Sequence, residues 1–147
     1  MFIRYNTVMK AIKTDANNYV LRIDPGEELI EQLRLFCEKE KIGGGWFWAI
    51  GAAGEVTLSF YNLETREYED TVLLERLEIA SLTGNLAMKK SELIIHAHGS
   101  LSSPDLKTYS GHVKKLLISG TCEVLLRAFD VPLTRASDPE TGLNILQ

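Results

Sequence analysis

Apolar and polar positions alternate with a period of two in several stretches of the chain, the first of them at residues 18–23. There Tyr19, Leu21 and Ile23 occupy every second position. Because side chains two residues apart lie on the same side of an extended strand, this alternation predicts a β-strand. The same pattern predicts later strands near residues 46–53, 56–62, 68–74, 78–83, 93–98 and 122–129.

One stretch between the first predicted strand and a run of three glycines has a helical period instead. Its apolar residues recur at the spacing of one helix face: Leu29, Ile30, Leu33, Phe36 and Cys37. Asp24 is suited to cap the helix, with Glu27 completing a capping box, and Pro25 suits the first helical position. The glycines at 43–45 oppose its continuation. The pattern therefore predicts one amphipathic helix over residues 24–42.

Six or more strands and a single good helix are typical of an α+β fold, with the helix packed on one face of a mostly antiparallel central sheet. The chain has 147 residues, 45% of them apolar, which is enough for one hydrophobic core. We expect a single domain over residues 1–147. Residues 46–50 are apolar throughout, so both faces of this strand need cover, and a homo-oligomer would supply it.

Charge argues against one class of partner. Twenty acidic against sixteen basic residues give a formal net charge of −4, so the long-range field repels a nucleic-acid backbone. A local basic patch stays open at two adjacent pairs, Lys89 with Lys90 and Lys114 with Lys115. DNA binding is therefore an alternative that the overall charge does not support.

Cysteine content and apolar run length indicate the compartment. Cys37 and Cys122 are too few and too far apart for a disulfide framework, so we expect two reduced, buried thiols. No run approaches the length of a membrane span, and residues 1–6 lack the regions of a signal peptide. We expect a cytoplasmic protein without a membrane partner.

All three histidines of the chain fall within residues 96–112. His96 and His98 are two apart in a predicted strand, so both imidazoles should lie on one face. His112 follows a predicted loop, on a Ser-Gly-His turn, and would complete three nitrogen ligands, the number found in an open zinc site. Copper or nickel would also suit three imidazoles. The alternative is a structural His-x-His pair with an unrelated third histidine.

Two glutamates lie inside apolar stretches, where an unpaired carboxylate is costly to bury. Glu123 lies between Cys122 and Val124, and Glu78 is embedded likewise. Each needs a partner, which is a metal-bound histidine, a metal-bound water on which the carboxylate acts as a base, or a buried arginine. Glu123 is therefore a candidate catalytic residue, with a structural ion pair as the alternative.

Other motifs do not indicate a function. The glycine-rich residues 43–54 lack the Gly-Lys-Ser/Thr of a phosphate loop and precede no helix, so they are better read as a closely packed strand. Trp46 and Trp48 share one strand face and suit the core or a subunit interface better than a stacking platform. No serine has the context of a Gly-x-Ser-x-Gly nucleophile.

The order and spacing of these segments resemble those of a known family. The capped helix is followed by a Gly-containing strand pair around residues 50–60, then Leu82-Thr83-Gly84-Asn85, His96-Ala97-His98, Gly111-His112, Cys122-Glu123-Val124 and the tail at 135–146. Together they resemble the plants-and-prokaryotes-conserved (PPC) domain over about residues 18–147. The resemblance implies a central antiparallel sheet with few helices and a homotrimer.

The resemblance also implies a metal site at the His-x-His and Gly-His histidines, which here are His96, His98 and His112. Two departures affect the third ligand: Ser110 and Leu116 stand where the family commonly has glycine. The AT-hook that precedes the domain in plant members is missing, so a DNA-binding role rests on fold analogy alone.

The sequence therefore favours a small homotrimeric protein that binds zinc, or another divalent transition metal, with an open position for water or a small anionic ligand. If the site is catalytic, Glu123 is the candidate acid/base of a hydrolase or lyase-like step. The alternatives from other classes are a DNA-associated or regulatory interaction protein and an oligomeric scaffold without a ligand.

Overall fold

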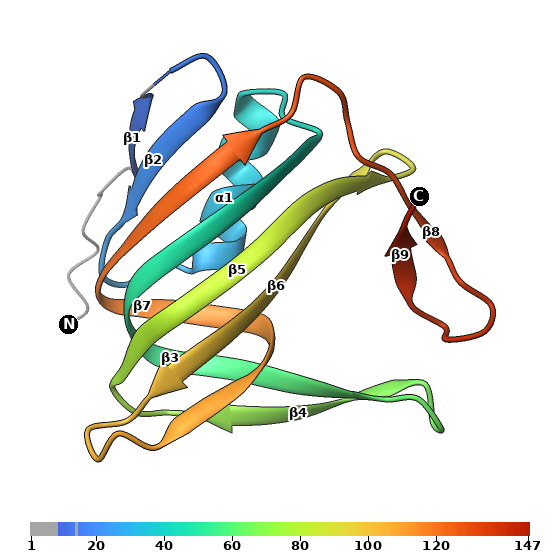
Figure 1. The fold of residues 1–147 in the computed structure, drawn as a ribbon. Coiled ribbons are helices and arrows are strands. Elements are labelled where there is room, and N and C mark those ends of the chain that lie inside the picture. The colour runs from blue at the N-terminus through green and yellow to red at the C-terminus, as the bar shows by residue number, and fades with distance from the viewer. Residues whose placement is uncertain (1–8, 14) are drawn as a thin grey trace.

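A computed structural model describes residues 9–13 and 15–147 (Figure 1). Residues 1–6, on which the expectation of no signal peptide rested, lie outside the described part. The elements in chain order are β1 (Lys10–Lys13), β2 (Asn18–Ile23), α1 (Leu29–Lys39), β3 (Gly44–Asn62), β4 (Glu67–Leu73), β5 (Leu77–Lys89), β6 (Glu92–Ser102), β7 (Thr108–Ala128), β8 (Arg135–Ser137) and β9 (Asn144–Leu146). The predicted fold class, a mostly antiparallel sheet with one main helix, is confirmed.

The main sheet has the strand order β1-β2-β7-β6-β5-β3-β4, and β7 also pairs with β3. All of its pairings are antiparallel. The long strand β7 pairs first with β6 and then, farther along, with β3 and β2. The four strands β3, β5, β6 and β7 therefore close into a ring of pairings. Figure 1 shows that β3 and β7 each bend sharply along their length.

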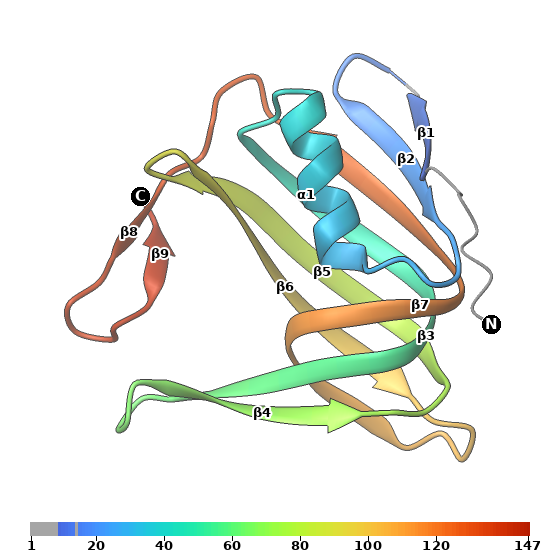
Figure 2. The same cartoon turned by 180° about the vertical axis from the view of Figure 1, so that it is seen from behind.

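Helix α1 covers one face of the sheet (Figure 2). Its buried residues are Leu29, Leu33, Phe36 and Cys37, which pack in one core with strand residues such as Phe47 and Leu126. Burying a large apolar side chain contributes about 1.5–3 kcal/mol, so these buried side chains supply much of the free energy that holds α1 on the sheet.

The helix begins later than its capping pattern predicted. Its first residue is Leu29, and Glu28 is the N-cap, whose carboxylate accepts hydrogen bonds from the backbone of Ile30 and Glu31. The predicted reciprocal contact exists, because Glu27 accepts from the Asp24 backbone nitrogen at 2.8 Å. It closes a turn ahead of the helix, however, and the backbone of Gly26 and Glu27 within that turn bonds to Ile118 of β7.

Strands β3, β5, β6 and β7 are all longer than the alternation predicted. The stretches predicted near 46–53 and 56–62 form one strand, β3. Its register shifts between Ala49 and Gly51 in the pairing with β5, and between Gly51 and Leu58 in the pairing with β7. At Gly51 a Cβ atom would lie 2.2 Å from the Thr121 carbonyl oxygen, so the glycine permits close approach of β7 at the bend. Strand β7 begins at Thr108, well before the predicted residue 122.

The face of the sheet opposite α1 carries no helix in the described chain (Figure 1). Trp48 and Leu125 are register partners on β3 and β7. Together with Ile50 they expose apolar side chains there, at 47%, 44% and 58% of their surface. This open face is the surface that the sequence predicted to need cover.

Candidate metal centre

Two adjacent strands bring the three histidines together. His96 and His98 lie on β6 with parallel side-chain directions, as their spacing of two predicted. His112 lies on β7 directly opposite His98 in the strand register. The sequence placed His112 on a turn, which is wrong: the backbone continues the β6–β7 hairpin ladder. Strand pairing therefore fixes the third histidine as firmly as the first two.

The ligand nitrogens of these three imidazoles converge. One nitrogen from each residue lies within 4.8 Å of the others, and the ring centroids are 5.0–5.5 Å apart. The Nε2 atoms of His96 and His98 are separated by 3.2 Å. Two nitrogens bound tetrahedrally to one zinc ion, each at its usual bond length, would be about 3.3 Å apart. The spacing of the first two donors therefore fits a shared metal.

The surroundings keep two of these imidazoles neutral. Burial, followed by the positive charges of His112, Arg135 and His98, lowers the pKa of His96 to about 4. Burial also lowers the pKa of His112, with His98 and Lys114 acting in the same direction and Asp70 opposing them. Because a metal binds the unprotonated imidazole, both side chains hold the form that binds metal at neutral pH.

The C-terminal hairpin β8–β9 adds a residue that sequence reasoning missed. The Arg135 guanidinium donates to Asn85 Oδ1 at 2.6 Å and to the Asn144 carbonyl, and it approaches His96 Nδ1 at 3.4 Å. Its Nε atom and His112 Nδ1 are buried and have no hydrogen-bond partner among the residues that the structure describes. Nothing near residue 135 in the sequence signals this contact, because it depends on how the tail folds back.

The hairpin β3–β4 forms another wall of the site. The Tyr68 ring lies 4.9 Å from the His112 ring between centroids. Asp70 on the same strand accepts from the Ser59 hydroxyl at 2.7 Å and pairs with Lys114 at 2.6 Å. These contacts place an aromatic ring and a fixed ion pair beside His112.

Glu123 lies away from the histidines. It is exposed and in register with Ile50 of β3 on one side and Arg22 of β2 on the other. At the level of Glu123, β7 pairs with β3, β3 pairs with β5 and β5 pairs with β6, so with strands about 4.8 Å apart Glu123 is roughly 14 Å from His98 across the sheet. Within one chain it does not reach the cluster. The expected burial of Glu123 and of Glu78 is wrong, since both side chains are exposed.

The remaining sequence candidates have ordinary structural positions. Trp46 is half-buried and donates from Nε1 to Thr83 Oγ1 at 3.1 Å. Cys37 and Cys122 are free and buried, as predicted. In each of the two predicted lysine pairs, a neighbouring side chain holds at least one ammonium group. Lys89 donates to Asn144, Lys114 pairs with Asp70, and Lys115 pairs with Glu55 at 2.7 Å.

No helix in the described part of the chain is both long and apolar enough to cross a membrane.

Comparisons with known proteins agree with the arrangement of strands. A protein from Bacteroides thetaiotaomicron named a "putative DNA binding protein" has 30% sequence identity and a TM-score of 0.91, with 96% of this chain and 98% of that chain covered. A protein from Archaeoglobus fulgidus, named as metal-containing, has 31% identity and a TM-score of 0.82, with 95% and 96% covered.

A third relative is much longer than this chain. The bifunctional protein GlmU of Synechococcus sp. (strain JA-3-3Ab) is 31% identical over 127 residues, which cover 84% of this chain. The match spans 19% of that relative's length, about a fifth. The sequence model of the Plants and Prokaryotes Conserved (PCC) domain, the family that the sequence resembled, matches residues 11–130. The chain belongs to the Plants and Prokaryotes Conserved domain family.

Proposed function

We propose that the protein binds a divalent transition metal ion, zinc first, through His96, His98 and His112. The observation that carries the proposal is the convergence of one nitrogen from each imidazole within 4.8 Å. The neutral state of His96 and His112 and the tetrahedral spacing of the first two donors support it. The name of the Archaeoglobus relative as a metal-containing protein is consistent with it.

Three imidazoles leave an open coordination position, which suits a catalytic or ligand-binding site better than a closed structural one. Lewis acidity is the chemistry that zinc would supply there, and a hydrolase or lyase would use it. The chain's own contribution is to hold the three nitrogens, through the β6–β7 register, and to place the positive charge of Arg135 beside His96. That charge favours a small anionic ligand over a cationic one.

Glu123 is not part of the proposed site, because β3 and β5 lie between it and the histidines of its own chain. Among the described residues, the metal-ligand cluster contains histidines alone and no carboxylate. We therefore assign no acid/base residue to this site.

We also propose that the protein is a homotrimer that packs through the open face of the sheet. His98 and Trp48 are both register partners of Thr83, one on each side of β5. The histidine cluster therefore borders the exposed apolar patch of Trp48, Ile50 and Leu125. A partner chain seated on this patch would cover it and would border the metal site.

Elemental analysis of protein purified without added metal or a histidine tag tests the metal proposal. We expect close to one zinc or other transition-metal ion per chain. The double variant His96→Ala, His98→Ala and the single variant His112→Ala should both lose it while keeping a cooperative unfolding transition. Full metal content in folded His112→Ala would rule out the three-histidine site. Wild-type protein that is metal-free and takes up no zinc on titration would rule out the function.

A further inference from the structure

A second recess lies on the helix side of the molecule, away from the histidines. It encloses about 420 Å³ between the end of α1, the β5–β6 hairpin and the loop that follows β7. Leu93 of β6 lines it, three residues before His96. Because side chains alternate along a strand, these two residues point to opposite faces of β6. The recess is therefore separate from the candidate metal centre.

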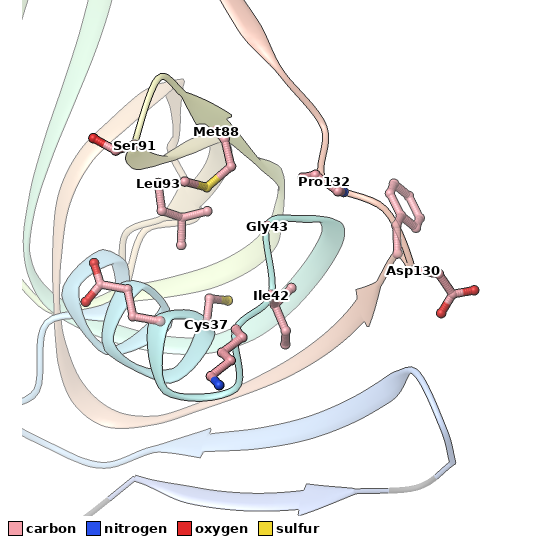
Figure 3. Close-up of a pocket in the computed structure, with 11 residues that line it drawn as sticks. Cys37, Ile42, Gly43, Met88, Ser91, Leu93, Asp130 and Pro132 are labelled. Carbon is pink, nitrogen blue, oxygen red and sulfur yellow. The ribbon is translucent and has the colours of Figure 1, made fainter.

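The interior of the recess is apolar and contains two sulfur atoms. Cys37, Ile42 and Leu93 line it from the core and are 0%, 8% and 8% exposed. Figure 3 shows the sulfur atoms of Cys37 and Met88 directed toward the same space. Thioether and thiol groups make favourable contacts with aromatic rings. The interior thus suits the apolar or aromatic part of a small molecule, and its volume is within the usual range for ligand pockets.

The rim carries charges of both signs. Glu38 and Lys41 lie at the end of α1, joined by a backbone turn in which the Lys41 nitrogen donates to the Glu38 carbonyl. Within the described residues their side chains form no ion pair with each other, and Glu38 pairs with Arg34 instead. Arg34 occupies only Glu38 Oε1, and the Lys41 side chain has no hydrogen bond or ion pair within the described residues. Asp130 also lines the recess, but its Oδ1 accepts from Asn17 Nδ2 at 2.8 Å, and Figure 3 shows its carboxylate directed away from Met88 and Leu93.

Lys41 adopts a left-handed conformation, with φ of 58°. Glycine usually takes this position just after a helix, because a side chain makes the conformation costly. Here a lysine takes it and so places an ammonium group at the rim. The Lys41 ammonium and the one Glu38 oxygen that Arg34 does not bond are complementary to a ligand that itself carries both charges.

We infer that this recess binds a zwitterion with an apolar body, of the class of α-amino acids with aromatic or large aliphatic side chains. The ligand's carboxylate faces Lys41, its ammonium group faces Glu38, and its side chain enters the space lined by Cys37, Met88 and Leu93. This site does not depend on the metal proposal.

Methionine-methyl NMR tests the inference directly, because Met88 lines the recess and Met9 does not. The probes are L-phenylalanine, phenethylamine and 3-phenylpropionate, which share a phenyl ring and differ in their charged groups. We expect L-phenylalanine to shift the Met88 signal saturably, to leave the Met9 signal unchanged, and to bind more tightly than either single-charge analogue. Equal or tighter binding of an analogue, or no Met88 shift at millimolar probe, would overturn the inference.

Single-charge variants test the rim. Glu38→Gln and Lys41→Gln should each weaken L-phenylalanine about two- to fivefold, the range expected for one exposed ion pair. Glu40→Gln is the matched control, since Glu40 lies at the same helix end, is exposed and does not line the recess. An equal loss in the Glu40 variant, or no loss in the other two, would show that the rim charges do not hold the ligand.

Discussion

At the residue scale, the histidine cluster makes the stability of the metal-free protein depend on pH. Folded His96 takes up its proton only near pH 4, against about 6.5 for an ordinary imidazole. Between these values the unfolded state binds more protons, so the free energy of unfolding falls as the pH is lowered from about 6.5 toward 4. The lowered pKa of His112 acts in the same direction.

Thermal unfolding in chelator from pH 7.5 to 5 measures this effect. We expect the melting temperature to fall by about 2–4 °C for each kcal/mol lost. His96→Asn should flatten the dependence, since it removes the imidazole with the largest shift. An unchanged slope in that variant would assign the acid sensitivity to other groups.

The site could be predicted from sequence only where local spacing decides it. Residues two apart on a strand share a face, so His96 and His98 followed from the pattern. Arg135 and Tyr68 could not, because they reach the cluster through hairpins whose folding depends on contacts far along the chain. The burial of Glu123 was predicted wrongly for a related reason. Alternation shows that a strand has two faces, but it does not show which face is left uncovered.

At the element scale, the start of α1 depends on one carboxylate. Glu28 accepts from Ile30 and Glu31 in the first helical turn and also from the Leu116 nitrogen of β7 at 2.9 Å. Glu28→Ala should therefore lower the free energy of unfolding by about 1–2 kcal/mol, the usual cost of losing an N-cap. Urea unfolding measures it. Glu40→Ala, at the opposite end, should change stability by less than about 0.5 kcal/mol, and a similar loss in both variants would contradict the capping role.

The same element shows what local patterns leave open. Asp24 and Glu27 have capping-box chemistry, and the contact forms, yet the chain between them is a turn tied to β7. Likewise the alternation predicted two strands, near residues 46–53 and 56–62, but Gly51 allows one long strand to bend while keeping its pairing with β7. The period of the apolar positions predicted whether a segment is a helix or a strand. The boundaries of these elements were set by pairing with distant parts of the chain.

At the scale of the whole molecule, charge argues against strong DNA binding. The net charge is −4, and Lys114 and Lys115 are paired with Asp70 and Glu55. We expect no shift of duplex DNA in a gel assay at low salt and micromolar protein. Binding that weakens steeply as salt is raised would contradict this expectation, because it would reveal phosphate contacts.

The open face of the sheet is the surface through which we expect copies of the chain to assemble. Leu125 is 44% exposed beside Trp48 in the apolar patch, whereas Leu35 is 45% exposed on α1, which covers the opposite face of the sheet. Both leucines are thus equally accessible in a single chain. Only Leu125 would become buried in the proposed homotrimer, where a charged replacement has no partner and must lose its hydration.

Leu125→Arg should therefore dissociate the assembly, while Leu35→Arg should leave it intact. Light scattering coupled to size exclusion gives the mass, which for the wild type should be three times the 16.5 kDa of one chain. A wild-type monomer would exclude the trimer. A Leu125→Arg trimer would instead move the interface to another surface and leave the Trp48 patch without a partner. Because the histidine cluster borders this patch, loss of metal on dissociation would further show that neighbouring chains complete the site.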